Sequence, residues 1–198
     1  MTVSDLSALD SQDTAYVKGR FMPLGLLARA NGWDVDALRL EMAGGRVPKV
    51  SYILPDGTEM IPTDYFALVG DGSELDTLRD RFIRRYEVAV ARLGLSSADE
   101  SAATWESYLS GGFAACLKSV TPESIALKGA LVDAITALVS DPKVDDAAWS
   151  AALCAAVSQL DDLEMPFARW DDIRFGSRSS RARLIDDVRA QYPGVFAD

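Results

Sequence analysis

TPESIALKGALVDAITALVSDP, residues 121–142, is the stretch that decides the fold class. It begins like a helix, because Thr121 can cap free backbone N–H groups and Pro122 suits the first turn. Apolar residues then recur at three- and four-residue spacing up to Asp141–Pro142, where proline stops a helix. The stretch therefore predicts a long helix with one buried face.

The segments on both sides of this stretch carry the same helical pattern. Each has apolar residues at three- and four-residue spacing, which predicts a helix with one buried stripe. They are residues 73–94, 96–120, 145–163 and 179–193. The pair Gly111–Gly112 breaks or narrows the second of these helices, because glycine weakens a helix interior.

A different pattern fills the first 70 residues. Two short helical patterns, residues 22–33 and 34–46, are separated by Asn31–Gly32, a strong turn signal. Two strand-like runs follow on either side of Pro55–Asp56–Gly57, which predicts a β-hairpin. Together these elements predict a winged helix-turn-helix.

The two patterns meet at Gly70–Asp71–Gly72, which is the best candidate for a domain boundary. We expect residues 1–70 to form a winged helix-turn-helix-like unit and residues 73–198 to form an α-helical domain. The predicted fold is therefore mainly α: a small N-terminal winged helix-turn-helix unit with a β-hairpin, followed by an α-helical bundle.

Composition excludes several classes of function. The chain contains no histidine, so serine and cysteine triads and histidine-bearing metal sites lose a usual member. Catalysis would fall to carboxylates, Lys, Tyr, Cys or Arg, and a pure binding role stays open. We expect no metal and no cofactor.

Charge and targeting signals limit the partners. A net charge of −10 repels nucleic acid and anionic membranes alike. No run approaches the roughly 20 apolar residues of a membrane span, and the first residues lack a signal-peptide pattern. Cys116 and Cys154 show no disulfide spacing. A cytoplasmic protein that does not bind membranes is therefore expected.

The predicted winged unit does not look like a DNA-binding unit. Its second helix, residues 34–46, carries Asp34, Asp36 and Glu41 against Arg39 and Arg46, and residues 1–70 contain six basic and nine acidic residues. Major-groove binding needs basic or amide side chains on that helix. The unit could instead dock a protein partner, for example by strand addition at the hairpin edge, or be purely structural.

Arginine is concentrated in residues 169–189, which hold six of the 20 basic residues. Arg178 and Arg181 lie near the expected start of the last helix, where Ser179 or Ser180 would be the cap and cations are disfavoured unless an anion compensates. The anion could be an internal carboxylate from residues 159–164, which would make the cluster structural. It could instead belong to a ligand, such as an amino-acid carboxylate, a nucleotide or a phosphopantetheine arm.

On the ligand hypothesis, four residues bind the anion: Arg174, Arg178, Ser180 and Arg181. The Gly111–Gly112 pair also has two interpretations. It could admit a ligand or a second backbone, with Tyr108, Ser110 and Cys116 lining the gap, or it could allow close helix packing. Cys116 would be a nucleophile only if Lys118, Lys128 or a helix N-terminus lowered its pKa. The acid–base candidates are Glu106, Tyr108, Glu123 and Asp172.

Five short motifs carry a resemblance to a known family. They are Tyr108–Gly112 (YLSGG), Cys116–Leu117, Val120–Glu123 (VTPE), Arg174–Gly176 (RFG) and Ser180–Arg181. Together with the winged unit, which is similar to that of MerR proteins, they resemble an uncharacterised bacterial family of natural-product biosynthesis proteins. The resemblance covers nearly the whole chain and implies a place in secondary metabolism. It supplies no catalytic residues, and residues 175–180 lack the proline that the family pattern has before its Ser-Arg pair.

Three functions from different classes remain. The first is a natural-product biosynthesis protein that binds an anionic small molecule or a carrier-bound substrate, with a metal-free tailoring enzyme as its catalytic form. The second is an accessory or scaffold protein that docks a biosynthetic partner through the winged unit. The third is a transcriptional regulator, which would need a basic face that the winged unit does not show.

Overall fold

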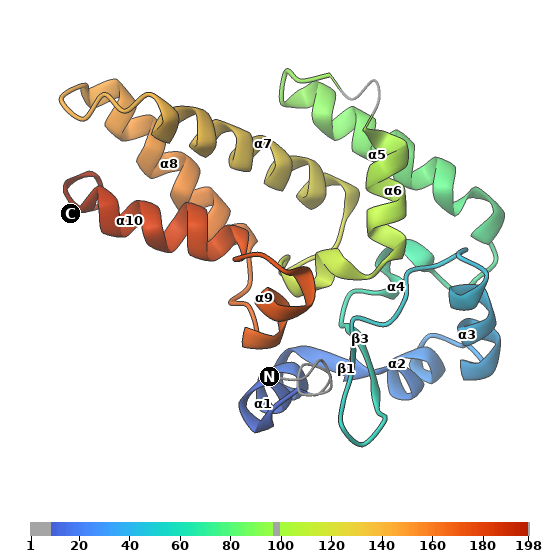
Figure 1. The fold of residues 1–198 in the computed structure, drawn as a ribbon. Helices are drawn as coiled ribbons and strands as arrows, with labels where there is room; N and C mark the ends of the chain where they lie inside the picture. The colour runs from blue at the N-terminus through green and yellow to red at the C-terminus, as the bar shows by residue number, and fades with distance from the viewer. Residues whose placement is uncertain (1–8, 97–99, 198) are drawn as a thin grey trace.

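A computed structural model describes residues 9–96 and 100–197 (Figure 1). The described chain is mainly helical, as predicted, with one small antiparallel sheet near its N-terminus. No described helix combines the length and the apolar character that crossing a bilayer requires. The N-terminal elements are α1 (Ser11–Arg20), β1 (Phe21–Pro23), α2 (Leu24–Ala30), α3 (Val35–Ala43), β2 (Tyr52–Ile53), β3 (Glu59–Pro62) and α4 (Phe66–Val69).

The sheet has the strand order β1-β3-β2, and both pairings are antiparallel. The predicted hairpin at Pro55–Gly57 is present. Its turn is fixed by Asp56, whose carboxylate accepts a hydrogen bond from Thr58 N at 2.9 Å, and by Gly57, whose φ of 82° suits glycine. The helical pattern that we expected from residue 22 begins two residues later, because Phe21–Pro23 pair with β3 as a third strand.

The C-terminal elements are predominantly helical. They are η2 (Leu75–Thr77), α5 (Leu78–Arg92), α6 (Ser101–Leu109), η3 (Gly112–Ala115), α7 (Pro122–Ser140), α8 (Ala147–Leu163), α9 (Arg169–Phe175), η4 (Ala182–Asp186), α10 (Asp187–Gln191) and η5 (Pro193–Val195). Helix α7 begins where the sequence predicted, and Thr121 is its cap, because Thr121 Oγ1 accepts a hydrogen bond from Ser124 N at 3.1 Å.

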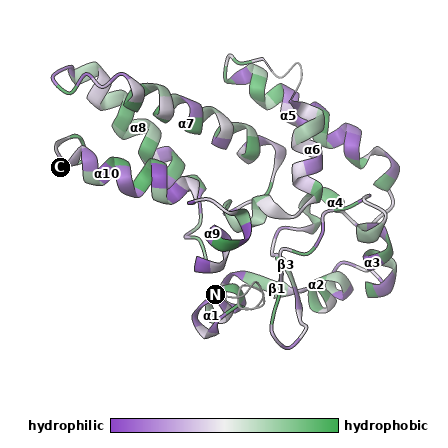
Figure 2. Ribbon diagram, viewed as in Figure 1, coloured by the Kyte–Doolittle hydropathy of each residue, from purple (hydrophilic) through white to green (hydrophobic). Residues whose placement is uncertain are grey.

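Helices α5, α7 and α8 form the body of the molecule, with α7 packed against both others. Hydrophobic residues run along α8 (Figure 2), and those of its inner face, such as Leu153, Val157 and Leu160, are fully buried. They form a core with α7 and the last helices. Trp149 also ties the two long helices together by donating a hydrogen bond to Leu138 O at 3.0 Å.

A second core joins the two predicted domains across Gly70–Gly72. It contains Leu24 and Leu38 from the N-terminal helix pair and Phe82 and Trp105 from α5 and α6. A third core places the sheet against η3. The N-terminal unit is therefore packed on the helical body through apolar side chains rather than only tethered to it.

Gly111 marks a close approach between the N-terminal unit and the helical body. Its φ is 76°, and a Cβ built on it would lie 2.7 Å from the carbonyl oxygen of Lys49. Next to this contact, Lys49 N donates a hydrogen bond to Leu109 O at 2.9 Å. Of the interpretations considered for the double glycine, Gly111 fits the approach of a second backbone.

Replacing Gly111 with Ala is expected to lower the free energy of unfolding by about 2 kcal/mol or more, because the new methyl group would overlap the Lys49 carbonyl at an unfavourable φ. Gly129→Ala is the matched control, since a Cβ there meets no atom within 4 Å and lies in helix α7. The control should gain roughly 1 kcal/mol. Urea denaturation measures both variants, and a shift of the same sign in both would contradict the assignment.

Candidate functional site

A pocket of about 360 Å³ lies between the end of α6, helix α7 and the connection that follows α9. Segments far apart in the sequence build its walls. The lining residues are Ser107, Ser110, Gly112, Phe113, Cys116, Lys128, Phe167, Asp172, Phe175, Ser177, Arg178, Ser179, Ser180 and Arg183. This volume is near the lower end of the range found for small-molecule sites.

The connection after α9 is held in a defined turn. Gly176 ends α9 in the left-handed conformation, with a φ of 64°. Asp172 Oδ1 then accepts a hydrogen bond from Ser179 N at 2.8 Å, and Ser179 Oγ accepts one from Ala182 N at 3.1 Å. Ser179 is therefore the cap of the last helix, one of the two serines expected for that role.

This last helix spans residues 180–191 and includes α10. It contains a π-helical turn, η4. Leu184 and Ile185 of η4 are buried in the core, whereas Arg183 is exposed and lines the pocket. A π-helical turn inserts an extra residue into a helix and is frequent at functional sites. It changes which side chains share a face and so contributes to the position of Arg183.

One of the lining residues of the pocket, Lys128, belongs to a buried ion pair. Lys128 Nζ lies 2.9 Å from Glu164 Oε1, and Glu164 is completely buried. Ser180 Oγ donates a hydrogen bond to the same carboxylate oxygen. Burial alone would lower the pKa of Lys128, but Cys116 and the Glu164 carboxylate outweigh burial and raise it above its usual value. Lys128 is therefore a charged ammonium group at neutral pH.

All three predicted anion-binding arginines pair with carboxylates of the chain itself. Arg178 forms two hydrogen bonds with Asp187, at 2.7 and 2.9 Å, and Arg181 pairs with Asp161. Asp161 also accepts from Arg189 at 2.9 Å. The anion next to Arg181 is therefore an internal carboxylate. Asp161 belongs to residues 159–164, the segment that was expected to supply an internal carboxylate.

Arg174 lies outside this pocket, at the contact between α9 and the sheet. Its Nη1 donates to Ser51 O at 2.7 Å, and its guanidinium carbon lies 4.8 Å from the ring centre of Tyr52 and 4.5 Å from that of Phe175. Its Nε is 3.2 Å from the buried carboxylate of Asp171, which also accepts from Tyr52 OH at 2.9 Å. Arg174 therefore links the N-terminal unit to the residues beside the pocket.

The four acid–base candidates do not form one site. Asp172 lines the pocket, whereas Glu106 is exposed on α6 and Glu123 pairs with Arg85 at 2.7 Å. Tyr108 is buried in an aromatic cluster, with its ring centre 4.7 Å from that of Phe82, and burial raises its pKa. A group held in its protonated form in this way is poorly suited to act as a base near neutral pH.

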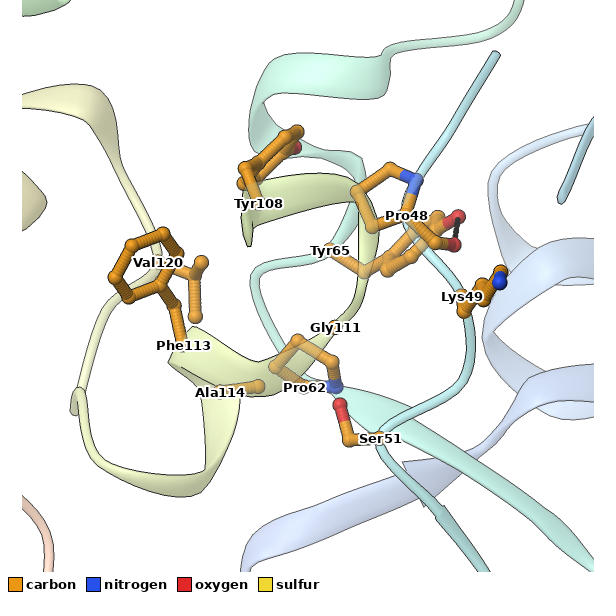
Figure 3. Close-up of a pocket in the computed structure, with 10 residues that line it drawn as sticks. All are labelled: Pro48, Lys49, Ser51, Pro62, Tyr65, Tyr108, Gly111, Phe113, Ala114 and Val120. Carbon is orange, nitrogen blue, oxygen red and sulfur yellow. Dashed lines mark hydrogen bonds between the residues drawn. The ribbon is translucent and has the colours of Figure 1, made fainter. Parts of the chain in front are cut away.

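Tyr108 and Gly111 line a separate, much smaller cavity (Figure 3). Its volume is about 20 Å³, which is room for one water molecule rather than a ligand. Pro48 and Tyr65 line the same cavity, and Tyr65 OH donates a hydrogen bond to Pro48 O at 2.7 Å. This cavity belongs to the junction between the N-terminal unit and α6.

The pocket therefore brings together six of the twelve candidate residues: Ser110, Gly112, Cys116, Asp172, Arg178 and Ser180. Burial raises the pKa of the Cys116 thiol, which opposes its use as a thiolate nucleophile. The remaining six lie elsewhere in the fold. Pocket residues that the sequence did not mark as a group include Lys128, Arg183, Phe167 and Phe175, because only the tertiary fold joins α7 to residues 167–183.

Comparison with known proteins identifies a family without an assigned activity. A family model described as "Family of unknown function (DUF6058)" matches residues 77–193, more than half of the chain. The match includes every lining residue of the pocket and leaves out the N-terminal unit. No curated protein and no solved structure matches the chain.

Replacing Lys128 with Met is expected to lower the free energy of unfolding by about 3–5 kcal/mol, because Glu164 would remain buried without its partner charge. The double variant Lys128→Met/Glu164→Gln should recover a large part of this loss, since it removes the unpaired charge. Thermal and urea unfolding measure both. A double variant less stable than Lys128→Met alone would show that the ion pair does not cause the loss.

The Asp161 ion pairs predict a pH dependence. Burial by itself would raise the pKa of Asp161, but hydrogen bonds from Arg189 and Arg181 outweigh it and lower that pKa. A carboxylate with a lowered pKa stabilises the fold above its unfolded pKa of about 4, and this stability is lost as the pH falls through the folded value.

Between about pH 5 and pH 2, the wild type should therefore lose more stability than Asp161→Asn, which has no carboxylate there to protonate. Asp162→Asn, a change at the exposed neighbour, is the control and should follow the wild type. Urea unfolding at several pH values gives the comparison, and parallel curves for the wild type and Asp161→Asn would contradict the assignment.

Proposed function

The chain belongs to the DUF6058 family, for which no function is known, and from the geometry of its pocket we propose that it binds a small anionic molecule there. The proposal concerns the pocket between α6, α7 and residues 167–183. It assigns the primary role to binding.

The lining charge of the pocket carries this proposal. Lys128, Arg178 and Arg183 line the pocket against one carboxylate, Asp172, in a protein whose net charge is −10. Within residues 9–96 and 100–197, no carboxylate forms an ion pair with Arg183, whereas Lys128 and Arg178 each have one. An exposed, unpaired guanidinium at the wall of a pocket is suited to bind a carboxylate or phosphate.

The resemblance to natural-product biosynthesis proteins supports the same pocket. Four of its five motifs each contribute at least one lining residue: Gly112 from YLSGG, Cys116, Phe175 from RFG and Ser180. We therefore propose that the ligand is an intermediate or precursor of secondary metabolism, bound in the cytoplasm.

Catalysis in this pocket would depend on few groups. Of the proposed acids and bases it contains Asp172, and the Cys116 thiol is protonated at neutral pH because burial raises its pKa. A metal-free tailoring enzyme would use Asp172 as its acid or base, with Arg183 holding the substrate. Binding requires only the groups that are present, so it is the function proposed here.

The N-terminal unit supports a second candidate function, docking of a protein partner. Helices α2 and α3 followed by the β2–β3 hairpin are arranged in the order of a winged helix-turn-helix. The side chain of Arg39 on α3 is paired with Asp36 and Glu59, which leaves less positive charge for a DNA phosphate. Large apolar side chains are exposed on this unit at Leu26, Leu40 and Ile53. These features favour a protein partner over DNA, and so an accessory role over transcriptional regulation.

Arg183→Ala is expected to weaken binding of anions to the pocket by about tenfold or more, which is the usual effect of losing a charge-assisted hydrogen bond. Arg84→Ala, a change at an exposed arginine on α5, is the matched control and should bind like the wild type. A thermal-shift screen with amino acids, nucleotides and phosphopantetheine compounds selects the ligand, and calorimetry measures its affinity. Equal affinities for the wild type and Arg183→Ala would reject the proposal.

A further inference from the structure

The pocket has an aromatic side as well as a charged one. Phe113, Phe167 and Phe175 all line it. Phe175 is 49% exposed even though the Arg174 guanidinium lies 4.5 Å from the centre of its ring. Leaving apolar rings open to water in a pocket is unfavourable unless something apolar covers them.

Rings of this kind favour a flat, apolar ligand group. Aromatic side chains pair best with another ring, either stacked with an offset or edge to face. Gly112 lies directly beside Phe175, since a Cβ built on it would be in van der Waals contact with the ring at 3.7 Å. A pocket of about 360 Å³ has room for one ring with a short side chain.

The charges of the pocket indicate how much negative charge the ligand carries. Lys128 is paired with Glu164 and Arg178 with Asp187, so Arg183 is the cation left to meet a ligand among the described lining residues. One guanidinium matches one carboxylate in a two-hydrogen-bond geometry. Asp172, which also lines the pocket, repels negative charge, and it repels a dianion more strongly than a monoanion. A monoanion therefore fits better than a phosphate dianion.

We infer that the ligand is a free aromatic carboxylic acid, whose ring packs against Phe167 and Phe175 and whose carboxylate binds Arg183. This inference rests on the proposed function and names the ligand class for the same pocket. It also selects the free acid over the carrier-bound form. A carboxyl group joined to a carrier as a thioester has lost the charge that Arg183 would recognise.

Calorimetry on the full chain with five probes tests the inference. The probes are 3-phenylpropionate, propionate, 3-phenylpropionamide, inorganic phosphate and 4′-phosphopantetheine. Propionate lacks the ring, and 3-phenylpropionamide lacks the charge. Inorganic phosphate and 4′-phosphopantetheine carry phosphate instead of a carboxylate. We expect 3-phenylpropionate to bind at least about tenfold more tightly than any of the others, since each loses a ring contact or a charged hydrogen bond.

Two variants assign the contacts. Phe175→Leu should weaken 3-phenylpropionate by about two- to tenfold and leave propionate unchanged, because only the ring contact is lost. Arg183→Ala should reduce 3-phenylpropionate to the affinity of its amide. Phe196→Leu, a change at a half-buried phenylalanine outside the pocket, is the control and should change none of the affinities.

The possible failures are distinguishable. If propionate, phosphate or 4′-phosphopantetheine binds as tightly as 3-phenylpropionate and loses affinity in Arg183→Ala, the pocket binds anions but the aromatic class is wrong. If 3-phenylpropionamide matches the acid, recognition of the charge is wrong. If none of the anions binds, both the ligand class and the proposed function are rejected.

Discussion

A carboxylate with no access to water lies where the main segments of the pocket meet. Glu164, at the end of α8, accepts from Lys128 of α7 and from Ser180 at the start of the last helix, and it pairs in a β-bridge with Leu117. Removing an ionised carboxylate from water costs several kcal/mol unless partners compensate. These partners are therefore held near fixed positions, and the pocket above them keeps its shape.

The charges around this carboxylate leave one arginine of the pocket wall unpaired in an acidic protein. Most arginines of residues 169–189 are used internally, since Arg174, Arg178, Arg181 and Arg189 each have a carboxylate partner. The opposite charges of such pairs cancel when seen from a distance, and each pair holds its two backbone segments together. What remains at the pocket wall is the guanidinium of Arg183, which has no carboxylate partner among the described residues, together with the carboxylate of Asp172.

Helix starts and turns could be predicted from the sequence because their signals are local. Thr121 and Pro122 begin α7, and Asp56–Gly57 make the hairpin turn, with partners only a few residues away. Helix α1 and strand β1 were not predicted: α1 buries only Asp13 and Val17, and β1 is a strand only because residues 60–62 pair with it. The pocket was predicted in part. Arginine enrichment located residues 174–183, but the pairing partners, which lie elsewhere in the fold, decide which arginine of the pocket is left unpaired.

Two of the contacts between the N-terminal unit and the helical body are made directly beside the pocket. Lys49 touches Gly111, the neighbour of Gly112, and Ser51 accepts from Arg174, the neighbour of Phe175. A displacement of residues 49–51 would therefore shift both the glycine and the aromatic wall of the pocket. If the proposed ligand and the proposed partner each shift this segment, their binding equilibria would be coupled, and by thermodynamic reciprocity each would alter the affinity of the other by the same factor.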